Sequence, residues 1–252
     1  MTTPLNFIDV DDLLAAGPVV VPWLWDGLLA PGMFALLHGD SKVGKSTLAV
    51  QLGKAIACGE PFLDLATRPG QVLYVSVEMT HPQVCLNLEP LHPRPGMSYA
   101  FRFGVLGAGR PVFKALEDEI TTRHAVLVIL DTLAMWAAPR LADENDNAGL
   151  LREALPWFNL ARTTDVCILV IHHARKSGGG PIEAVRGGSS LAALADQVLH
   201  YTQPKGQSII PTRRLISVVG RYPQSPSAVS VNMVLGQLVA HSPKTPPAPL
   251  QV

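Results

Sequence analysis

Residues 39–46 match the G-x-x-x-x-G-K-[ST] pattern, which is the spacing of a phosphate-binding loop. The glycines let the backbone wrap, so that successive N–H groups and the N-terminus of the next helix point at phosphate oxygens. The lysine of this pattern reaches the β- and γ-phosphates, and the hydroxyl beside it ligates Mg²⁺. We therefore predict a nucleotide site in which Ser46 is a metal ligand. Its residues are Gly39, Asp40, Ser41, Lys42, Val43, Gly44, Lys45, Ser46 and Thr47.

An acidic residue ends an apolar run farther along the chain. Asp131 follows the apolar residues 125–130. It has the form of a Walker B aspartate, which holds Mg²⁺ through water. The alternative is an aspartate at a strand end that caps the next turn. Because a phosphate loop lies upstream, we favour the metal role for Asp131.

Two other strand ends carry groups that can serve hydrolysis. Glu78 follows the strand predicted over residues 71–77, so it should emerge at the same edge of the sheet as Asp131. A carboxylate there orients the attacking water or accepts its proton, or is a solvated acid that begins a helix. His172 and His173 also follow an apolar run. Adjacent strand residues point to opposite faces, so only one can face the γ-phosphate; strand-end histidines are more often structural.

Strands and helices alternate along the chain and must position these groups. Apolar runs typical of buried strands occur at 33–38, 71–77, 125–130 and 166–171. The alternation predicts an α/β fold with a mostly parallel central sheet and helices on both faces. Later strands are expected at 198–202, 214–220 and 229–234. A helix over 148–162 should take its N-cap from the acidic loop at 143–147, and Pro156 should kink that helix or mark its first turn.

Length and composition limit the class of protein. The chain has 252 residues, of which 48% are apolar and 16% charged. These values predict a globular domain with a sizeable core rather than a disordered chain. We divide it into an N-terminal extension (1–30), a core domain (31–240) and a disordered, proline-rich tail (241–252).

Charge, cysteines and hydropathy indicate where such a protein works. The sequence shows no transmembrane run and no signal-peptide pattern. Its three cysteines have no metal-ligand or disulfide spacing, which fits a reducing cytoplasm. The formal net charge is zero, which counts against a basic face that coats nucleic acid but allows a local basic channel.

The order of these motifs resembles that of the RecA-like P-loop ATPases, specifically the RepA-like hexameric replicative helicases and their mobile-element AAA-type relatives. The resemblance covers residues 25–235. Many families share the phosphate loop; the His-His-x-x-Lys and Arg-Gly-x-Ser-Ser pair is more specific. The matching segments are 39–47, 77–79, 129–133, 172–176, 186–190 with Asp196, and 220–221. The resemblance implies a RecA-like core with C-terminal antiparallel strands and ATP bound between neighbouring subunits.

The resemblance also implies roles for single residues. Glu78 is then the catalytic base, His173 senses the γ-phosphate, and Arg221 is an arginine finger on the ATP of the adjacent subunit. A guanidinium suits that role because it stabilises charge spread over the transferring phosphoryl group. The alternative is an exposed arginine on an edge strand. Many ring helicases carry a lysine two residues before the finger, whereas this chain has Val219, which implies a weaker finger or a different ring geometry.

A basic loop follows the two histidines. In the resembling family this loop lines a central channel and touches single-stranded DNA. Here it offers Arg175, Lys176 and Arg186 for contacts with the phosphate backbone. It has no aromatic residue for base stacking, and the acidic residues at 143–147 would repel DNA, so a solvated mobile loop is the alternative. No primase or origin-binding module is evident, so separate initiator or primase proteins are expected partners.

Three functions are compatible with these motifs. The leading one is an Mg²⁺-dependent ATPase that assembles into a ring, expected to be a hexamer, and moves on or unwinds single-stranded DNA in replication or recombination. Residues 1–30 would then act as an arm between subunits. The alternative is an ATP-gated regulatory or assembly protein that oligomerises without translocating. A small-molecule kinase would leave the histidine loop and the late Gly-Arg pair without a role.

Overall fold

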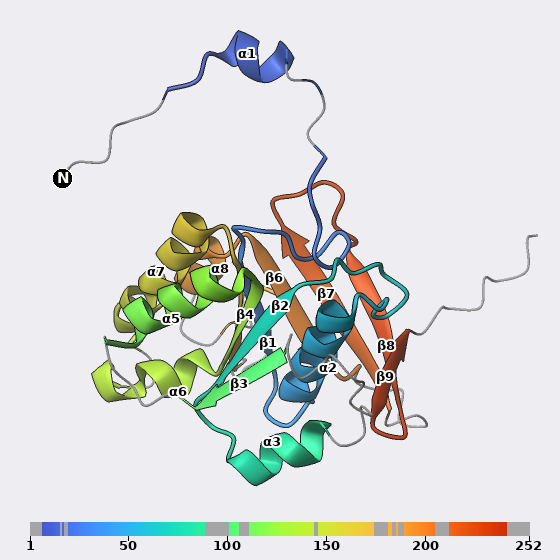
Figure 1. Ribbon diagram of the computed structural model, residues 1–252. Helices are drawn as coiled ribbons and strands as arrows, with labels where there is room; N and C mark the ends of the chain where they lie inside the picture. The colour runs from blue at the N-terminus through green and yellow to red at the C-terminus, as the bar shows by residue number, and fades with distance from the viewer. Residues whose placement is uncertain are drawn as a thin grey trace, which may run out of the picture.

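A computed structural model describes residues 7–15, 17, 20–88, 101–105, 111–143, 146–173, 181–182, 185, 189–204 and 212–240. These residues form a nine-stranded sheet in the order β3-β2-β4-β5-β1-β6-β7-β8-β9 (Figure 1). The first six strands of this order are parallel to one another. They are β1 (Phe34–Gly39), β2 (Gln71–Ser76), β3 (Phe101–Val105), β4 (Ala125–Asp131), β5 (Cys167–His173) and β6 (Gln197–Thr202). Antiparallel strands then extend the sheet: β7 (Arg213–Gly220), β8 (Ala228–Val234) and β9 (Gln237–Ala240).

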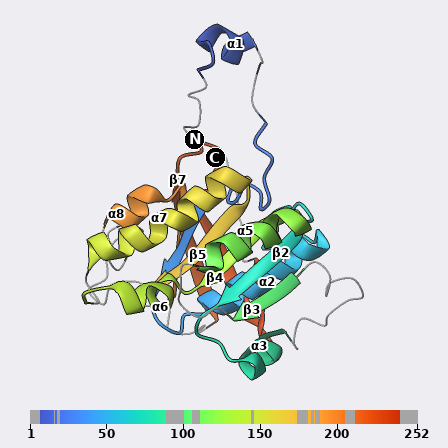
Figure 2. The same ribbon diagram turned by 60° about the vertical axis from the view of Figure 1, so that its left-hand side comes forward.

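Helices cover both faces of the sheet (Figures 1 and 2). One face carries α2 (Lys45–Cys58). The opposite face carries α5 (Pro111–Arg123), α6 (Leu133–Ala137), α7 (Asn147–Thr164) and α8 (Ser189–Leu194). The other described helices are α1 (Val10–Ala15), α3 (His81–Leu88) and the 3₁₀ turn η2 (Ala138–Arg140). In the described part of the chain, no helix is long and apolar enough to cross a membrane.

Each central strand contributes to two hydrophobic cores, because successive side chains of a strand point to opposite faces. On β1, Ala35 and Leu37 belong to the core under α2, whereas Phe34 and Leu36 belong to the core under α5, α6, α7 and α8. A strand buried on both faces must be apolar along its length. This requirement explains why continuous apolar runs identified these strands in the sequence.

The fold class predicted from the sequence is confirmed: a parallel core with helices on both faces continues into C-terminal antiparallel strands. The expected N-cap is present, because the Asp146 carboxylate accepts a hydrogen bond of 2.8 Å from the Gly149 N–H at the start of α7. Pro156 lies inside α7 and not in its first turn. The predicted tail (241–252) lies outside the described residues, and the division into three segments stays a prediction.

Candidate functional site

The phosphate loop joins β1 to α2 at the carboxyl edge of the parallel strands. Gly44 has a φ of 101°, in the left-handed region that favours glycine. Gly39 is required for a different reason, because a Cβ there would lie 2.0 Å from the carbonyl oxygen of Tyr201 on β6. Together the two glycines let the loop curl over the N-terminus of α2, where N–H groups without helical partners gather.

A cavity of about 730 Å³ opens beside this loop, which is within the usual size of a ligand pocket. The structure brings together here the predicted residues of the loop and of three strand ends, those of β2, β4 and β5. The cavity walls include Lys45, Ser46, Glu78, Asp131, Thr132 and His173. All of these except Thr132 were predicted as site residues, and their chemical roles stay predictions.

The ammonium group of Lys45 is held inside the loop. Its Nζ donates hydrogen bonds to the carbonyl oxygens of Gly39 (2.9 Å) and Asp40 (2.8 Å). Burial lowers the pKa of Lys45, whereas the nearby carboxylates of Asp131, Asp40 and Glu78 oppose that shift. An ammonium beside the positive end of α2 presents a binding surface to an anion.

Asp131 is buried and uses one carboxylate oxygen within the protein. Oδ2 accepts a hydrogen bond of 2.6 Å from the hydroxyl of Tyr74 on β2, whereas Oδ1 has no hydrogen-bond partner among the described residues. Burial raises the pKa of Asp131, and the hydroxyls of Tyr74 and Ser46 lower it. Sequence reasoning missed Tyr74; its signal was a single phenol among the aliphatic residues of β2.

These residues fit a bound Mg²⁺ ion. The unpartnered Asp131 oxygen and the Ser46 hydroxyl are hard oxygen donors on the wall of one cavity. Mg²⁺ usually takes one or two protein ligands and completes its coordination with water and substrate phosphates. Ser46 and Asp131 are therefore the residues that would hold it.

Glu78 lies between two groups from neighbouring segments. The Thr132 hydroxyl donates to Glu78 Oε1 at 2.5 Å, and His173 Nε2 lies 3.9 Å from the same oxygen. The second distance is too long for a hydrogen bond, and the contact is an ion pair only when the imidazole carries a proton. His173 and Thr132 lower the pKa of Glu78 while burial opposes them, so the carboxyl is ionised at neutral pH. Thr132 was missed in the sequence; its position directly after Asp131 was the available signal.

The two histidines at the end of β5 face opposite ways, as predicted for adjacent strand residues. His173 lines the cavity, whereas His172 is buried. His172 pairs in register with His38 of β1, and His38 pairs with His200 of β6. The rings of His38 and His200 are stacked 4.4 Å apart. Burial and the neighbouring His200 lower the pKa of His38 to about 3, so this histidine is neutral at physiological pH.

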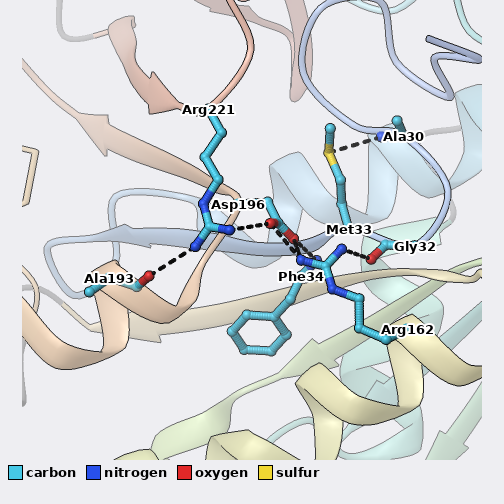
Figure 3. Close-up of polar contacts among 8 residues, drawn as sticks. All are labelled: Ala30, Gly32, Met33, Phe34, Arg162, Ala193, Asp196 and Arg221. Carbon is cyan, nitrogen blue, oxygen red and sulfur yellow. Dashed lines mark hydrogen bonds and ion pairs between the residues drawn. The ribbon is translucent and has the colours of Figure 1, made fainter. Parts of the chain in front are cut away.

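Arg221 lies at the opposite edge of the sheet from the cavity. It follows β7, whose end pairs with the start of β6. Its guanidinium is 3.4 Å from Asp196 Oδ1 and donates to the Ala193 carbonyl at 3.3 Å, while 58% of the side chain stays exposed (Figure 3). Asp196 also accepts hydrogen bonds from Arg162 and from the Phe34 N–H. Arg221 therefore lies away from the cavity of its own chain, and its role on a neighbouring subunit stays a prediction.

The residues predicted to contact DNA are Arg175, Lys176 and Arg186, and all three lie outside the described residues. Val219, at the position where many ring helicases carry lysine, is a partly exposed residue of β7. The prediction of a DNA contact therefore still rests on the sequence.

Comparison with known proteins places the chain in a family. The AAA domain matches residues 2–179, which is most of the chain. Relatives named DNA repair protein RadA include those of Halalkalibacterium halodurans (28% identical over 181 residues, 69% of this chain and 34% of the relative) and Synechocystis sp. (26% over 209 residues, 78% and 38%). The RadA of Streptococcus pneumoniae is 24% identical over 176 residues, 69% of this chain and 37% of the relative.

This chain thus spans between 34% and 38% of the length of these relatives. The match and the fold agree on a RecA-like P-loop architecture; the RepA-like branch is a finer assignment than they reach. With a phosphate loop between β1 and α2 and a family match over most of its length, the chain belongs to the AAA domain family.

Proposed function

We propose that this protein is an Mg²⁺-dependent ATPase. The observation that carries the proposal is the convergence of Lys45, Glu78 and Asp131 on one cavity beside the phosphate loop. Membership of the AAA domain family supports it. Phosphoryl transfer needs a lysine on the phosphates, an acid at the metal and a residue that positions water, and these three residues offer one group for each role.

Hydrolysis proceeds in this proposal by in-line attack of water on the γ-phosphorus. Glu78 orients the water and accepts its proton, and His173 keeps the pKa of that carboxyl low and senses the γ-phosphate. Lys45 and the loop N–H groups stabilise charge on the phosphate oxygens. Ser46 and Asp131 would hold Mg²⁺, which supplies further charge neutralisation when bound.

The finer proposal is a RepA-like ring, expected to have six subunits, with ATP at each interface. The position of Arg221 supports it: the arginine lies at the sheet edge away from its own cavity, with most of its side chain exposed. If that edge of one subunit faces the cavity of the next, Arg221 reaches the neighbour's γ-phosphate and stabilises the transition state.

Mixing experiments test this arrangement. Arg221→Ala subunits are titrated into wild-type protein at constant total concentration, and ATP hydrolysis is measured. A finger that acts on the neighbour predicts a loss of activity steeper than the fraction of mutant subunits. Arg68→Ala, which removes an exposed arginine elsewhere, should leave mixtures at full activity. A strictly linear decline with Arg221→Ala would contradict action across the interface.

We further propose that the ring acts on single-stranded DNA in replication, recombination or repair, with initiator or primase proteins as separate partners. Support comes from the basic residues Arg175, Lys176 and Arg186 and from relatives whose name is DNA repair protein RadA. The alternative is an ATP-gated assembly or regulatory protein, which the zero net charge favours.

Steady-state ATP hydrolysis with and without an oligo-dT strand separates the two functions. A DNA motor should be stimulated several-fold at low salt. The stimulation should fade as salt rises, because each phosphate contact releases counterions. Replacing the three basic residues by glutamine should abolish the stimulation, whereas Arg68→Gln should keep it. Turnover that ignores DNA at every salt concentration would support the assembly protein instead.

A further inference from the structure

Strand β7 passes behind the phosphate loop and makes a direct polar contact with it. Arg214 Nε donates a hydrogen bond of 3.2 Å to the carbonyl oxygen of Val43, across a sequence separation of 171 residues. Arg214 shares its face of β7 with Ile216 and Val218, and both of these belong to the core under α2. The arginine is therefore on the same side of the sheet as the loop.

This contact fixes the orientation of one peptide group of the loop. In a planar trans peptide, the carbonyl of one residue and the N–H of the next point in opposite directions. Because Arg214 holds the Val43 carbonyl from behind, the N–H of Gly44 points away from Arg214, and Gly44 lines the cavity. Successive N–H groups of such a loop are the donors that bind phosphate oxygens.

Residues of β6 and of the antiparallel strands β8 and β9 support the same region. Tyr201 Cε1 and Met233 Cε lie 3.8 and 3.7 Å from the point where a Cβ on Gly44 would stand. Gln51 of α2 is tied to the β8–β9 hairpin by hydrogen bonds of 2.8 Å. Burial raises the pKa of Tyr201 to about 12, and Arg214 lies close enough for its charge to oppose that shift.

We propose that Arg214 is a positioning residue for phosphate binding, which turns the Gly44 N–H toward the ligand and adds a positive charge behind the loop. The ligand class is a nucleoside di- or triphosphate, so this inference rests on the proposed nucleotide site. It extends that site to β7, an element outside the parallel core. Both effects act before any chemical step, so they should change nucleotide affinity more than turnover.

The test compares two substitutions of Arg214 with a control on the same strand. Arg214→Leu removes both the hydrogen bond and the charge, whereas Arg214→Lys keeps the charge and lacks the Nε donor. Arg213→Leu is the matched control, because adjacent strand residues point to opposite faces. Dissociation constants for ATP and ADP are measured by calorimetry with Mg²⁺, together with kcat, KM and the melting temperature of each nucleotide-free protein.

We expect Arg214→Leu to bind ATP and ADP about tenfold more weakly, as the loss of one hydrogen bond with a charged donor predicts. Arg214→Lys should recover part of that affinity, KM should change more than kcat, and Arg213→Leu should bind like wild type. If Arg214→Leu does not fold, the comparison of Arg214→Lys with wild type decides, with weaker ATP binding expected.

These measurements distinguish failure of the Arg214 proposal from failure of the proposed nucleotide site. If wild type binds ATP and the Arg214 variants bind it equally well, Arg214 is not a positioning residue, and the nucleotide site stands. Arg214 is also not a positioning residue if its variants lose kcat and thermal stability together with nucleotide affinity, since that pattern shows a general structural role. If wild type binds no ATP, the proposed function fails and the inference fails with it.

Discussion

Glu78 shares one carboxylate oxygen with two neighbours, Thr132 at 2.5 Å and His173 at 3.9 Å. His173 makes the largest contribution to lowering the pKa of Glu78, burial opposes it, and Thr132 lowers the pKa further. Glu78 therefore keeps its charge to a lower pH than a glutamate with the ordinary pKa of 4.5. Without His173 the pKa of Glu78 rises, and the same group takes up its proton at a higher pH.

Replacing His173 by alanine should thus move the acidic limb of the kcat profile for ATP hydrolysis to higher pH, besides lowering kcat itself. Thr132→Val removes the smaller contribution and should move the limb less. The measurement is kcat at saturating ATP across the acidic range, with each variant normalised to its own maximum. A limb that stays in place, or moves to lower pH, would show that Glu78 is not the base.

The phosphate-loop pattern and the residue types at the ends of apolar runs were enough to predict Lys45, Asp131 and Glu78 as neighbours, because parallel strands end at one edge of a sheet. The partners Tyr74 and Thr132 were not predictable in the same way. Each contacts a residue more than fifty positions away in the sequence, so the contacts depend on strand order and register, which no local pattern encodes.

Strands β5, β1 and β6 place His172, His38 and His200 side by side. The pKa of His38 is lowered to about 3 by burial and by His200, whereas a histidine in an unfolded chain has a pKa of about 6.5. Between these values the unfolded chain binds a proton that the folded chain does not, so stability falls as the pH falls from about 6.5 toward about 3. One such group changes stability by at most ~1.4 kcal/mol per pH unit.

His38→Leu should remove this part of the acid sensitivity. We expect wild type to lose about 2 kcal/mol more than the variant when urea unfolding at about pH 5 is compared with unfolding at about pH 7. His124→Asn, a change at an exposed histidine, serves as the control and should follow wild type. Parallel losses in wild type and His38→Leu would mean that the buried histidine does not govern acid stability.

The apolar runs predicted that these strands exist but not how they line up. The three histidines lie in a row only because β1 pairs with β5 on one side and with β6 on the other. Likewise, the support of the phosphate loop by Arg214 requires the antiparallel strands to pass behind it. Strand identity is a local property of the sequence, whereas strand order follows from how all the apolar faces are covered together.

The described N-terminal residues 7–15 are all exposed. They include Phe7, Leu13 and Leu14, with 88%, 55% and 74% of their surfaces accessible, and α1 stands away from the sheet in both views (Figures 1 and 2). Apolar side chains gathered on one exposed segment are typical of an interaction surface. In the proposed ring this segment is the arm that packs on the neighbouring subunit.

Deleting residues 1–20 should therefore weaken assembly. We expect the mass distribution in the presence of ATP and Mg²⁺, measured by analytical ultracentrifugation, to shift toward the monomer. Replacing Phe7, Leu13 and Leu14 by serine should reproduce the shift, whereas serine at the polar positions Asp11 and Asp12 should not. An unchanged distribution after the deletion would remove the segment from the ring interface.

The central proposal for this protein is ATP hydrolysis in the cavity beside the phosphate loop. The decisive comparison is steady-state hydrolysis with Mg²⁺ by wild type, by Lys45→Ala and by Lys54→Ala, a matched change in the same helix at a lysine paired with Glu60. Wild type and Lys54→Ala should turn over ATP, and Lys45→Ala should lose at least about a hundredfold in rate. Equal turnover by Lys45→Ala, or none by wild type, would contradict hydrolysis at this site.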